Sequence, residues 1–205
     1  MKLDAKTYLG HLRAYVNDHY VTDNGTDGHV VLQEKIFFPD PAKRARIRKI
    51  KLLLPGPGIA FKLDQEQSQS NCGRRSKPPL FHFLDDNAKP WSKRCDFVVF
   101  YVDGKSFNAD CIEFKSGSIA GPSIKEQLKA GSHWVRSLKK TIEFYADESR
   151  RIRLRKFIFG DKDDPEDYLD ANRQLNADPS VRYYHFDEVD GLLLSDLQNE
   201  SVQEL

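Results

Sequence analysis

Cysteines and long apolar runs are scarce in this chain, and each scarcity excludes a class of protein. There are 3 cysteines among 205 residues, at Cys72, Cys95 and Cys111. At this number and spacing they cannot build a disulfide framework or a zinc site, and such thiols are typical of a reducing cytoplasm. No apolar run approaches the length of a membrane span, and residues 1–6 lack a signal-peptide core. We therefore expect a cytoplasmic protein without membrane contact.

The net charge is also close to zero, because an excess of basic residues in one part of the chain is cancelled by an excess of acidic residues in another. The chain carries +1 overall, but residues 161–205 hold 13 acidic and 3 basic residues, a balance of −10 that leaves +11 on residues 1–160. A basic body suits a polyphosphate partner such as nucleic acid. For the acidic segment 161–205 several roles stay open: it could fold back, repel nucleic acid, face a second copy or another protein, or simply be solvated surface.

Length and apolar periodicity predict one α/β domain. With 205 residues, 39% of them hydrophobic, the chain can bury a sizeable core. The patterns predict helices over residues 4–20, 123–145, 165–176 and 191–198, and strands over 50–54, 59–63, 152–159 and 181–186. Residues 29–38 are ambiguous between helix and strand. This order favours a mixed β-sheet flanked by helices, with its core over roughly residues 45–190.

Two apolar segments that contain ionisable residues are the most informative part of the chain. Residues 93–100 and 112–116 are separated by the turn signal Asp103-Gly104, which predicts a β-hairpin. Charged residues inside apolar strands are costly unless they have a partner or a function. The hairpin is therefore where we look for a site.

The alternation of side chains along a strand tests which charged residues share a face. A two-residue loop pairs Asp96 with Cys111, and a four-residue loop pairs it with Glu113; in both registers Asp96, Glu113 and Lys115 lie on one face. A three-residue loop would place Asp96 opposite Ile112 and separate it from the other two. Two of the three common loop lengths thus predict a cluster of two acids and a lysine.

Two carboxylates beside an ammonium group suit metal-assisted phosphodiester cleavage. Mg²⁺ prefers oxygen ligands and takes one or two carboxylates together with waters and substrate phosphate. The lysine can orient a water or stabilise developing negative charge. The alternative is a surface hairpin with an ordinary ion pair between Glu113 and a lysine, which would contribute little stability.

The pattern of Asp96 followed by Glu113-Phe114-Lys115 resembles the PD-(D/E)xK nuclease superfamily over roughly residues 93–160. Cys95 stands where the family name has proline. The resemblance implies a restriction-endonuclease-like fold over the single domain 1–205. It also implies Mg²⁺, or Mn²⁺, held by Asp96, Glu113 and the Phe114 carbonyl, and Lys115 as the catalytic lysine. The chain offers no convincing match for the acid that the N-terminal helix of such enzymes often adds; Glu34 and Asp18 are weak candidates.

The predicted helix over residues 123–145 adds a candidate helper residue. Its apolar residues form one stripe, and Gln127 lies on that side, which directs it towards the sheet. The resemblance implies a supporting catalytic role for such a glutamine; a stripe-edge glutamine that reaches water is the alternative. The opposite side is basic and is expected to be a solvated helix face, through Lys125, Lys129, Arg136 and Lys140.

A polar segment over residues 65–79 is the predicted nucleic-acid contact loop, through Arg74, Arg75 and Lys77. Two functions from different classes follow. The first is a metal-dependent endonuclease acting on DNA, in restriction or antiphage defence by analogy with the superfamily. The second is a non-catalytic module of the same fold that binds nucleic acid or a protein.

Overall fold

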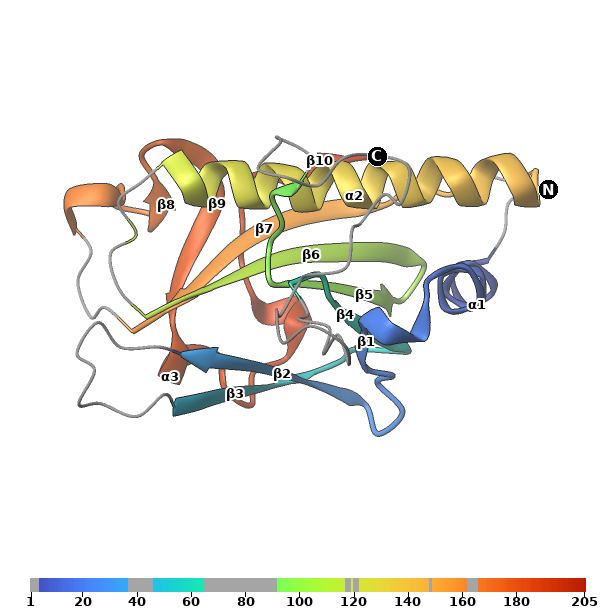
Figure 1. The fold of residues 1–205 in the computed structure, drawn as a ribbon, viewed down its shortest axis with the longest axis horizontal. Coiled ribbons are helices and arrows are strands. Elements are labelled where there is room, and N and C mark those ends of the chain that lie inside the picture. Colours follow the sequence, from blue (N-terminus) through green and yellow to red (C-terminus); the bar gives the residue numbers. More distant parts are fainter. Residues whose placement is uncertain are drawn as a thin grey trace, which may run out of the picture.

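A large mixed sheet organises the molecule (Figure 1). The computed structural model describes residues 4–36, 46–64, 92–116, 119, 122–147, 149–161 and 166–205. Within these residues the sheet has eight strands in the order β1-β4-β5-β6-β7-β9-β8, with β10 paired to β7. The strands are β1 (Val21–Asp23), β4 (Gly58–Lys62), β5 (Phe97–Asp103), β6 (Ser106–Lys115), β7 (Arg153–Gly160), β8 (Gln174–Leu175), β9 (Asp178–His185) and β10 (Gln203–Glu204). The predicted mixed α/β sheet flanked by helices is confirmed.

The predicted hairpin is formed by β5 and β6. Its register pairs Val102 with Phe107, which is the register of the four-residue loop, and the ladder continues to Asp103 and Ser106. Gly104 opens the turn with φ +55°, a conformation that glycine adopts without a steric penalty. Strands β4, β5 and β6 are antiparallel, whereas β6, β7 and β9 run parallel. The sheet therefore changes direction at β6, the strand that carries the predicted site.

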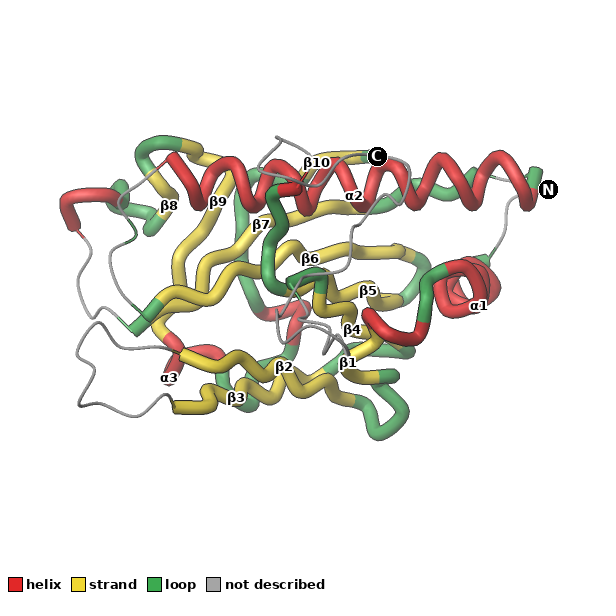
Figure 2. The backbone as a smooth tube through the Cα atoms, in the orientation of Figure 1, coloured by secondary structure: helices red, strands yellow, loops and turns green. Residues whose placement is uncertain are grey.

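Helices cover one face of the sheet (Figure 2). They are α1 (Ala5–Tyr15), capped by the Asp4 side chain, and α2 (Pro122–Ala146), the predicted long helix. Beneath α2, Trp134 meets Phe61 and Phe100 with ring centroids 5.8 and 6.4 Å apart. In the described part of the chain, no helix combines the length and the apolar character that crossing a bilayer requires.

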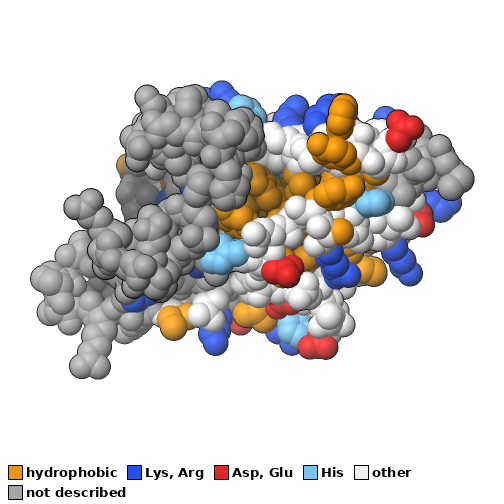
Figure 3. Space-filling view, turned by 45° about the vertical axis from the view of Figure 1, so that its right-hand side comes forward, with side chains coloured by type: hydrophobic (Ala, Val, Ile, Leu, Met, Phe, Trp, Pro, Cys, Tyr) orange, Lys and Arg blue, Asp and Glu red, His pale blue; other side chains and the backbone are white. Residues whose placement is uncertain are grey.

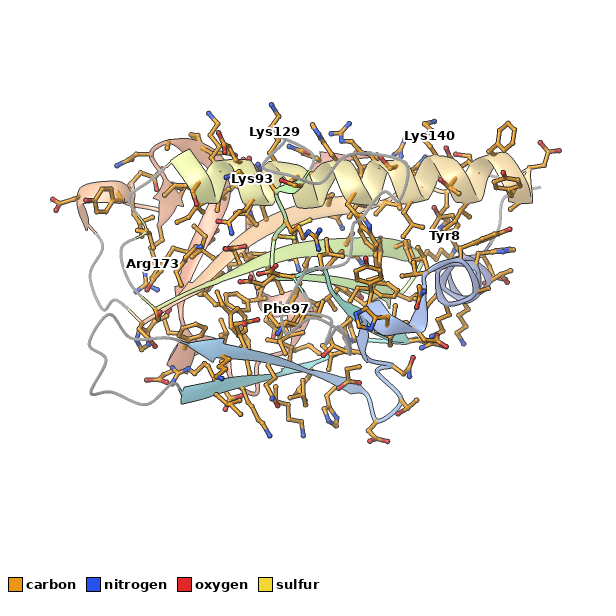
Figure 4. The ribbon with its side chains drawn as sticks, in the orientation of Figure 1. Tyr8, Lys93, Phe97, Lys129, Lys140 and Arg173 are labelled. Carbon is orange, nitrogen blue, oxygen red and sulfur yellow. The ribbon has the colours of Figure 1, made fainter. Side chains whose placement is uncertain are left out.

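A two-stranded ribbon covers the opposite face. Strands β2 (His29–Ile36) and β3 (Arg46–Leu53) pair antiparallel and pack, together with α3 (Phe186–Val189), over a second core. Residues 29–36, which were ambiguous in the sequence, thus form a strand, and the strand predicted at 50–54 begins four residues earlier. Phe97 lies between the sheet and this ribbon (Figure 4).

Some predicted helices are wrong or too long. The N-terminal helix ends at Tyr15, and a separate 3-10 turn follows over Asp18–Tyr20. Within the described residues of 165–176 there is only the 3-10 turn Glu166–Tyr168, followed by β8. The Asp170 side chain accepts from the backbone N–H groups of Asn172 and Gln174, which stabilises a turn where helical periodicity predicted a helix.

Two further predictions about helices were wrong. The helix predicted over 191–198 is reduced to the 3-10 turn Leu194–Asp196. Tyr145, the last residue of the apolar stripe predicted over residues 123–145 to face the sheet, is 70% exposed beside the 80%-exposed Phe144. Figure 1 shows the C-terminal end of α2 extending beyond the strands of the sheet; Ile142 and Ala146 still pack against the core there, whereas Tyr145 does not.

The acidic segment folds back onto the basic body. Asp187 lies 3.0 Å from Arg48, Asp178 lies 2.7 Å from Lys156, and Glu204 lies 3.3 Å from Arg151, each measured between charged atoms. Of the roles left open for this segment, folding back is the one that the structure displays. In the described residues, ion pairs join four acids of this segment to bases of residues 1–160: Asp161, Asp178, Asp187 and Glu204.

Candidate active site

The two predicted acids meet where β5 begins and β6 ends. Asp96 directly precedes β5, and continuing the register places it opposite Glu113. The backbone N–H of Asp96 donates to Glu113 Oε2 at 3.2 Å, and the N–H of Phe114 donates to Asp96 Oδ2 at 2.6 Å. Asp96 is 7% exposed and Glu113 only 1%. Both carboxylates are therefore held by the edges of paired strands, in a buried position.

Lys115 connects the acids to α2. Its Nζ lies 2.7 Å from Glu113 Oε1 and donates to Gln127 Oε1 at 3.2 Å. Ser123, one turn earlier on α2, donates to the same Gln127 oxygen at 3.2 Å. The structure thus brings together all four side chains predicted as catalytic. The Lys115 side chain remains 23% exposed, whereas the side chain of its partner Glu113 is 1% exposed.

Burial dominates the electrostatics of both acids. Removal from water raises the pKa of Glu113 to about 7, although the Lys115 ammonium acts in the opposite direction. Burial, followed by the negative charge of Glu113, raises the pKa of Asp96 well above its usual range, while the hydrogen bond from Phe114 lowers it. One partly exposed lysine does not compensate two buried acids, so the site favours an additional cation.

The donor atoms fit a hard divalent cation. Within the described residues, no donor contacts Asp96 Oδ1, which leaves that oxygen available as a ligand. The N–H and C=O of one residue point to the same edge of an extended strand, so the Phe114 carbonyl faces Asp96 as its N–H does. Two carboxylates and a carbonyl are a ligand set that Mg²⁺ accepts. No group of three or more His, Cys, Asp or Glu residues in the described ranges could hold a metal.

Two further acids influence the site, and one was not predicted. Asp64, just after β4, raises the pKa of Glu113 through its charge; the signal was an acid directly after an apolar strand. Glu34, a weak candidate from the sequence, raises the pKa of Asp96 across the gap between ribbon and sheet. Its carboxylate lies 2.7 Å from Lys62 Nζ. Ser123 was also missed, although its i, i+4 spacing to Gln127 could have identified it.

The remaining predicted residues lie elsewhere. Arg74, Arg75 and Lys77 fall outside the described residues. Asp18 belongs to the 3-10 turn after α1 rather than to a helix over the site.

Close packing behind the acids brings α2 near the sheet. Cys95 and Cys111 are buried, free thiols in the core under the helix. A Cβ at Gly131 of α2 would lie 2.4 Å from Cys95 Sγ and 3.4 Å from Cys111 Sγ. Only glycine at position 131 allows α2 to approach the sheet this closely. The close packing of the helix in turn positions Gln127 near Lys115.

Compared with known proteins, the chain matches no family model, no curated protein and no solved structure. The candidate site therefore stands on the geometry described above.

Proposed function

We propose that this protein is a metal-dependent nuclease of the PD-(D/E)xK superfamily that hydrolyses phosphodiester bonds in DNA. The observation that carries the proposal is the burial of Asp96 beside Glu113 on paired strands, with one partly exposed lysine between Glu113 and α2. An ordinary structural ion pair needs one acid and one base. A second buried acid raises the energy of the empty site, and a bound cation would lower it.

The order of elements supports the same proposal. Helix α1, the antiparallel strands β4, β5 and β6, helix α2 and the parallel strand β7 follow one another along the chain. This succession agrees with the restriction-endonuclease-like core that the motif resemblance implies, within a single domain. A role in antiphage defence in the cytoplasm is part of the proposal by analogy alone. Cleavage of both DNA strands would need two sites, and hence a dimer or two successive nicks.

Each residue has a distinct task in the proposed reaction. Asp96, Glu113 and the Phe114 carbonyl would hold Mg²⁺ or Mn²⁺, which when bound supplies an activated water and neutralises charge on the scissile phosphate. Glu113 must lose its proton to serve as a ligand, and its pKa of about 7 puts that step near neutral pH. Lys115 positions the water or stabilises the developing negative charge. Gln127, fixed by Ser123, orients the ammonium group.

Cleavage assays on matched substrates test the proposal. Plasmid, linear duplex, single-stranded DNA and RNA would be incubated with the wild-type protein and Mg²⁺ or Mn²⁺. We expect divalent-ion-dependent cleavage of DNA, and a loss of about 1,000-fold or more in Asp96→Asn and in Glu113→Gln, because each removes a charged ligand without changing side-chain volume. Asp103→Asn is the matched control, since this exposed acid ends β5, at the opposite end of the same hairpin strand.

Two results would contradict the proposal. Unchanged turnover in both acid variants would show that Asp96 and Glu113 are not the catalytic acids. Tight DNA binding by the wild-type protein with no cleavage under any divalent ion would identify a non-catalytic binding module instead.

A further inference from the structure

Gly160 is the neighbour of Lys115 on the next strand of the sheet. The two residues pair directly in the parallel ladder of β6 and β7, so their side-chain positions lie on the same face. That face is the one under α2, because Lys115 donates to Gln127 of this helix. The backbone N–H of Asp161 also donates to the carbonyl of Lys115 at 3.1 Å. The end of β7 thus holds the backbone of the candidate catalytic lysine.

Tyr183 fills the side-chain space that Gly160 leaves empty. It lies on β9, opposite Ile158, and belongs to the core under α2. A Cβ added at Gly160 would lie 2.7 Å from Tyr183 Cε2 and 2.8 Å from Tyr183 Oη. Both distances are shorter than non-bonded heavy atoms normally allow. The end of the tyrosine ring therefore lies over β7, one strand spacing of about 4.8 Å from the row of Lys115.

Strand β7 fills this face with its own side chains until it reaches Lys115. Leu154, Lys156 and Ile158 precede Gly160 on the same face and are buried. Core packing alone would be served by a β-branched residue at position 160. Instead, glycine leaves a gap at this place, and a flat ring from β9 closes it.

The Lys115 side chain has a neighbour in each direction within the protein. Glu113 Oε1 lies 2.7 Å from its ammonium group along the strand, and Gln127 Oε1 accepts from it at 3.2 Å from the helix above. Tyr183, 2% exposed, lies on the side of β7. Lysine has a long, flexible stem, so its two hydrogen-bonding partners alone leave other rotamers open. A ring on the β7 side removes the rotamers that would carry the ammonium group away from Glu113.

We propose that Tyr183, seated over Gly160, is a positioning residue for Lys115. Its ring closes the β7 side of the site and keeps the ammonium group against Glu113 and Gln127. The inference rests on the proposed nuclease function, in which this ammonium group positions the water or stabilises developing charge. Tyr183 acts only by restricting the lysine, and a misplacement of about 1 Å is enough to slow such a reaction strongly.

Substitutions of the tyrosine test the role of its ring. Tyr183→Leu removes the ring and Tyr183→Phe retains it. Cleavage of DNA in Mg²⁺ would be measured well below the melting temperature of each variant. In Tyr183→Leu, kcat should fall about 10–100-fold with KM within about twofold of wild type, because the lysine acts in the transition state and not in substrate binding. Tyr183→Phe should keep kcat within about twofold of wild type, because the lysine stays restricted.

A substitution of the glycine separates positioning from folding. Gly160→Ala alone should also lower kcat, because its methyl group displaces the ring. In Gly160→Ala/Tyr183→Leu the methyl group refills part of the space beside Lys115. The double variant should therefore have a kcat at least about threefold above that of Tyr183→Leu, a coupling expected only of residues that share one space.

Two controls carry matched changes away from the lysine. Val181→Ala removes buried apolar volume from the same face of β9, one position before Tyr183 on that face. Tyr145→Leu makes the tyrosine-to-leucine change on a side chain that is 70% exposed; Figure 3 shows apolar side chains at the surface of this kind. Both controls should keep kcat and KM within about twofold of wild type, even where the melting temperature falls.

Chemical labelling follows the position of Lys115 without any cleavage. Acetic anhydride acetylates accessible amines, and mass spectrometry gives the rate at Lys115 relative to that at the exposed Lys105. In metal-free buffer this ratio should rise at least about threefold in Tyr183→Leu, because the side chain regains rotamer freedom, and stay unchanged in Val181→Ala. If Tyr183→Leu does not fold, Gly160→Ala, which should raise the ratio as well, decides the question.

The two measurements distinguish the positioning role from the nuclease function. An unchanged labelling ratio in Tyr183→Leu, an equal loss of kcat in Tyr183→Phe or in Val181→Ala, or no recovery in the double variant would overturn the positioning role. Raised labelling in a protein that never cleaves DNA would support the positioning of Lys115 and overturn the nuclease proposal alone.

Discussion

Strand β6 carries two buried acids that the fold treats in opposite ways. Asp110 accepts two hydrogen bonds from Arg155, at 2.9 Å from Nε and 2.7 Å from Nη2. Arg155 also donates to Tyr101 Oη at 2.7 Å and to the Leu194 carbonyl at 3.0 Å. This Asp110–Arg155 cluster is one acid with one base, and its hydrogen bonds tie the C-terminal segment to the sheet.

Glu113, three residues later and on the other face, is much less well compensated. It shares a single, partly exposed lysine with a second buried acid. A structural pair is expected to satisfy its charges within the fold, whereas a functional group keeps an unfavourable charge for a ligand to complete. The comparison thus separates a cluster that serves stability from one that is costly in the empty protein.

Removing one charge should lower the stability of the protein much more at the Asp110–Arg155 cluster than at Glu113. Asp110→Asn leaves the guanidinium of Arg155 without its buried counter-ion and should destabilise the protein by about 3–5 kcal/mol. Glu113→Gln removes repulsion between two acids and should not lower stability in metal-free buffer. Urea unfolding of the two variants at pH 8 is the measurement. Equal destabilisation by both substitutions would mean that the two clusters have the same structural role.

Lys115→Ala should lower kcat by about 10²–10³-fold, since it removes the ammonium proposed to stabilise charge in the reaction. The acids that bind the metal remain. However, the loss of Lys115 removes a cation that lowers the pKa of Glu113, so metal binding should need a higher pH. Calorimetry with Mn²⁺ at pH 7 and pH 9 tests both statements, with Lys105→Ala in the hairpin turn as control. Absent metal binding even at pH 9 would show that Lys115 maintains the site itself.

Stability should fall as pH rises through the titration of Glu113. The unfolded chain releases this proton near pH 4.5, and the folded protein retains it up to about pH 7. The folded state therefore binds more protons in this window, and stability declines across it by on the order of 1–3 kcal/mol. The raised pKa of Asp96 acts in the same direction. Glu113→Gln should flatten the decline between pH 5 and 7, and saturating Mg²⁺ should offset it; an equally steep decline in the variant would assign it to other groups.

Local rules in the sequence were sufficient for the hairpin and for the cluster on it. Three loop lengths were open, and two of the three registers placed Asp96 with Glu113 and Lys115, so the cluster required only that the three-residue loop be absent. The long periodic stripe of α2 likewise directed Gln127 to the sheet. These predictions succeeded because each depends on neighbours along one strand pair or one helix.

Predictions failed where distant parts of the chain decide the structure. The helix expected over 165–176 gave way to a turn, in which the Asp170 carboxylate accepts backbone hydrogen bonds and Arg173 has a left-handed backbone, φ +58°. Tyr145 belongs to the periodic stripe, yet it is 70% exposed while Ile142, one turn earlier, is buried. The proximity of Asp64 to Glu113, and of Glu34 to Asp96, arises from packing between strands far apart in the sequence. The periodicity of a single segment cannot predict such a contact between distant segments.

Gln127 should have the smallest effect among the four side chains predicted as catalytic. Its side-chain oxygen accepts from both Lys115 and Ser123, so it orients the ammonium without touching the acids. Gln127→Ala should lower kcat by about tenfold, leave KM and metal affinity unchanged, and keep the melting temperature within about 1 °C, since the side chain is only half-buried. Ser123→Ala should show a weaker form of the same effect, because the Lys115–Gln127 hydrogen bond survives it. Steady-state kinetics of the two variants, with Lys125→Ala on the opposite side of α2 as control, measures the difference. Full activity in Gln127→Ala would show that Glu113 alone is sufficient to hold the lysine, and the functional cluster would then consist of the two acids and Lys115.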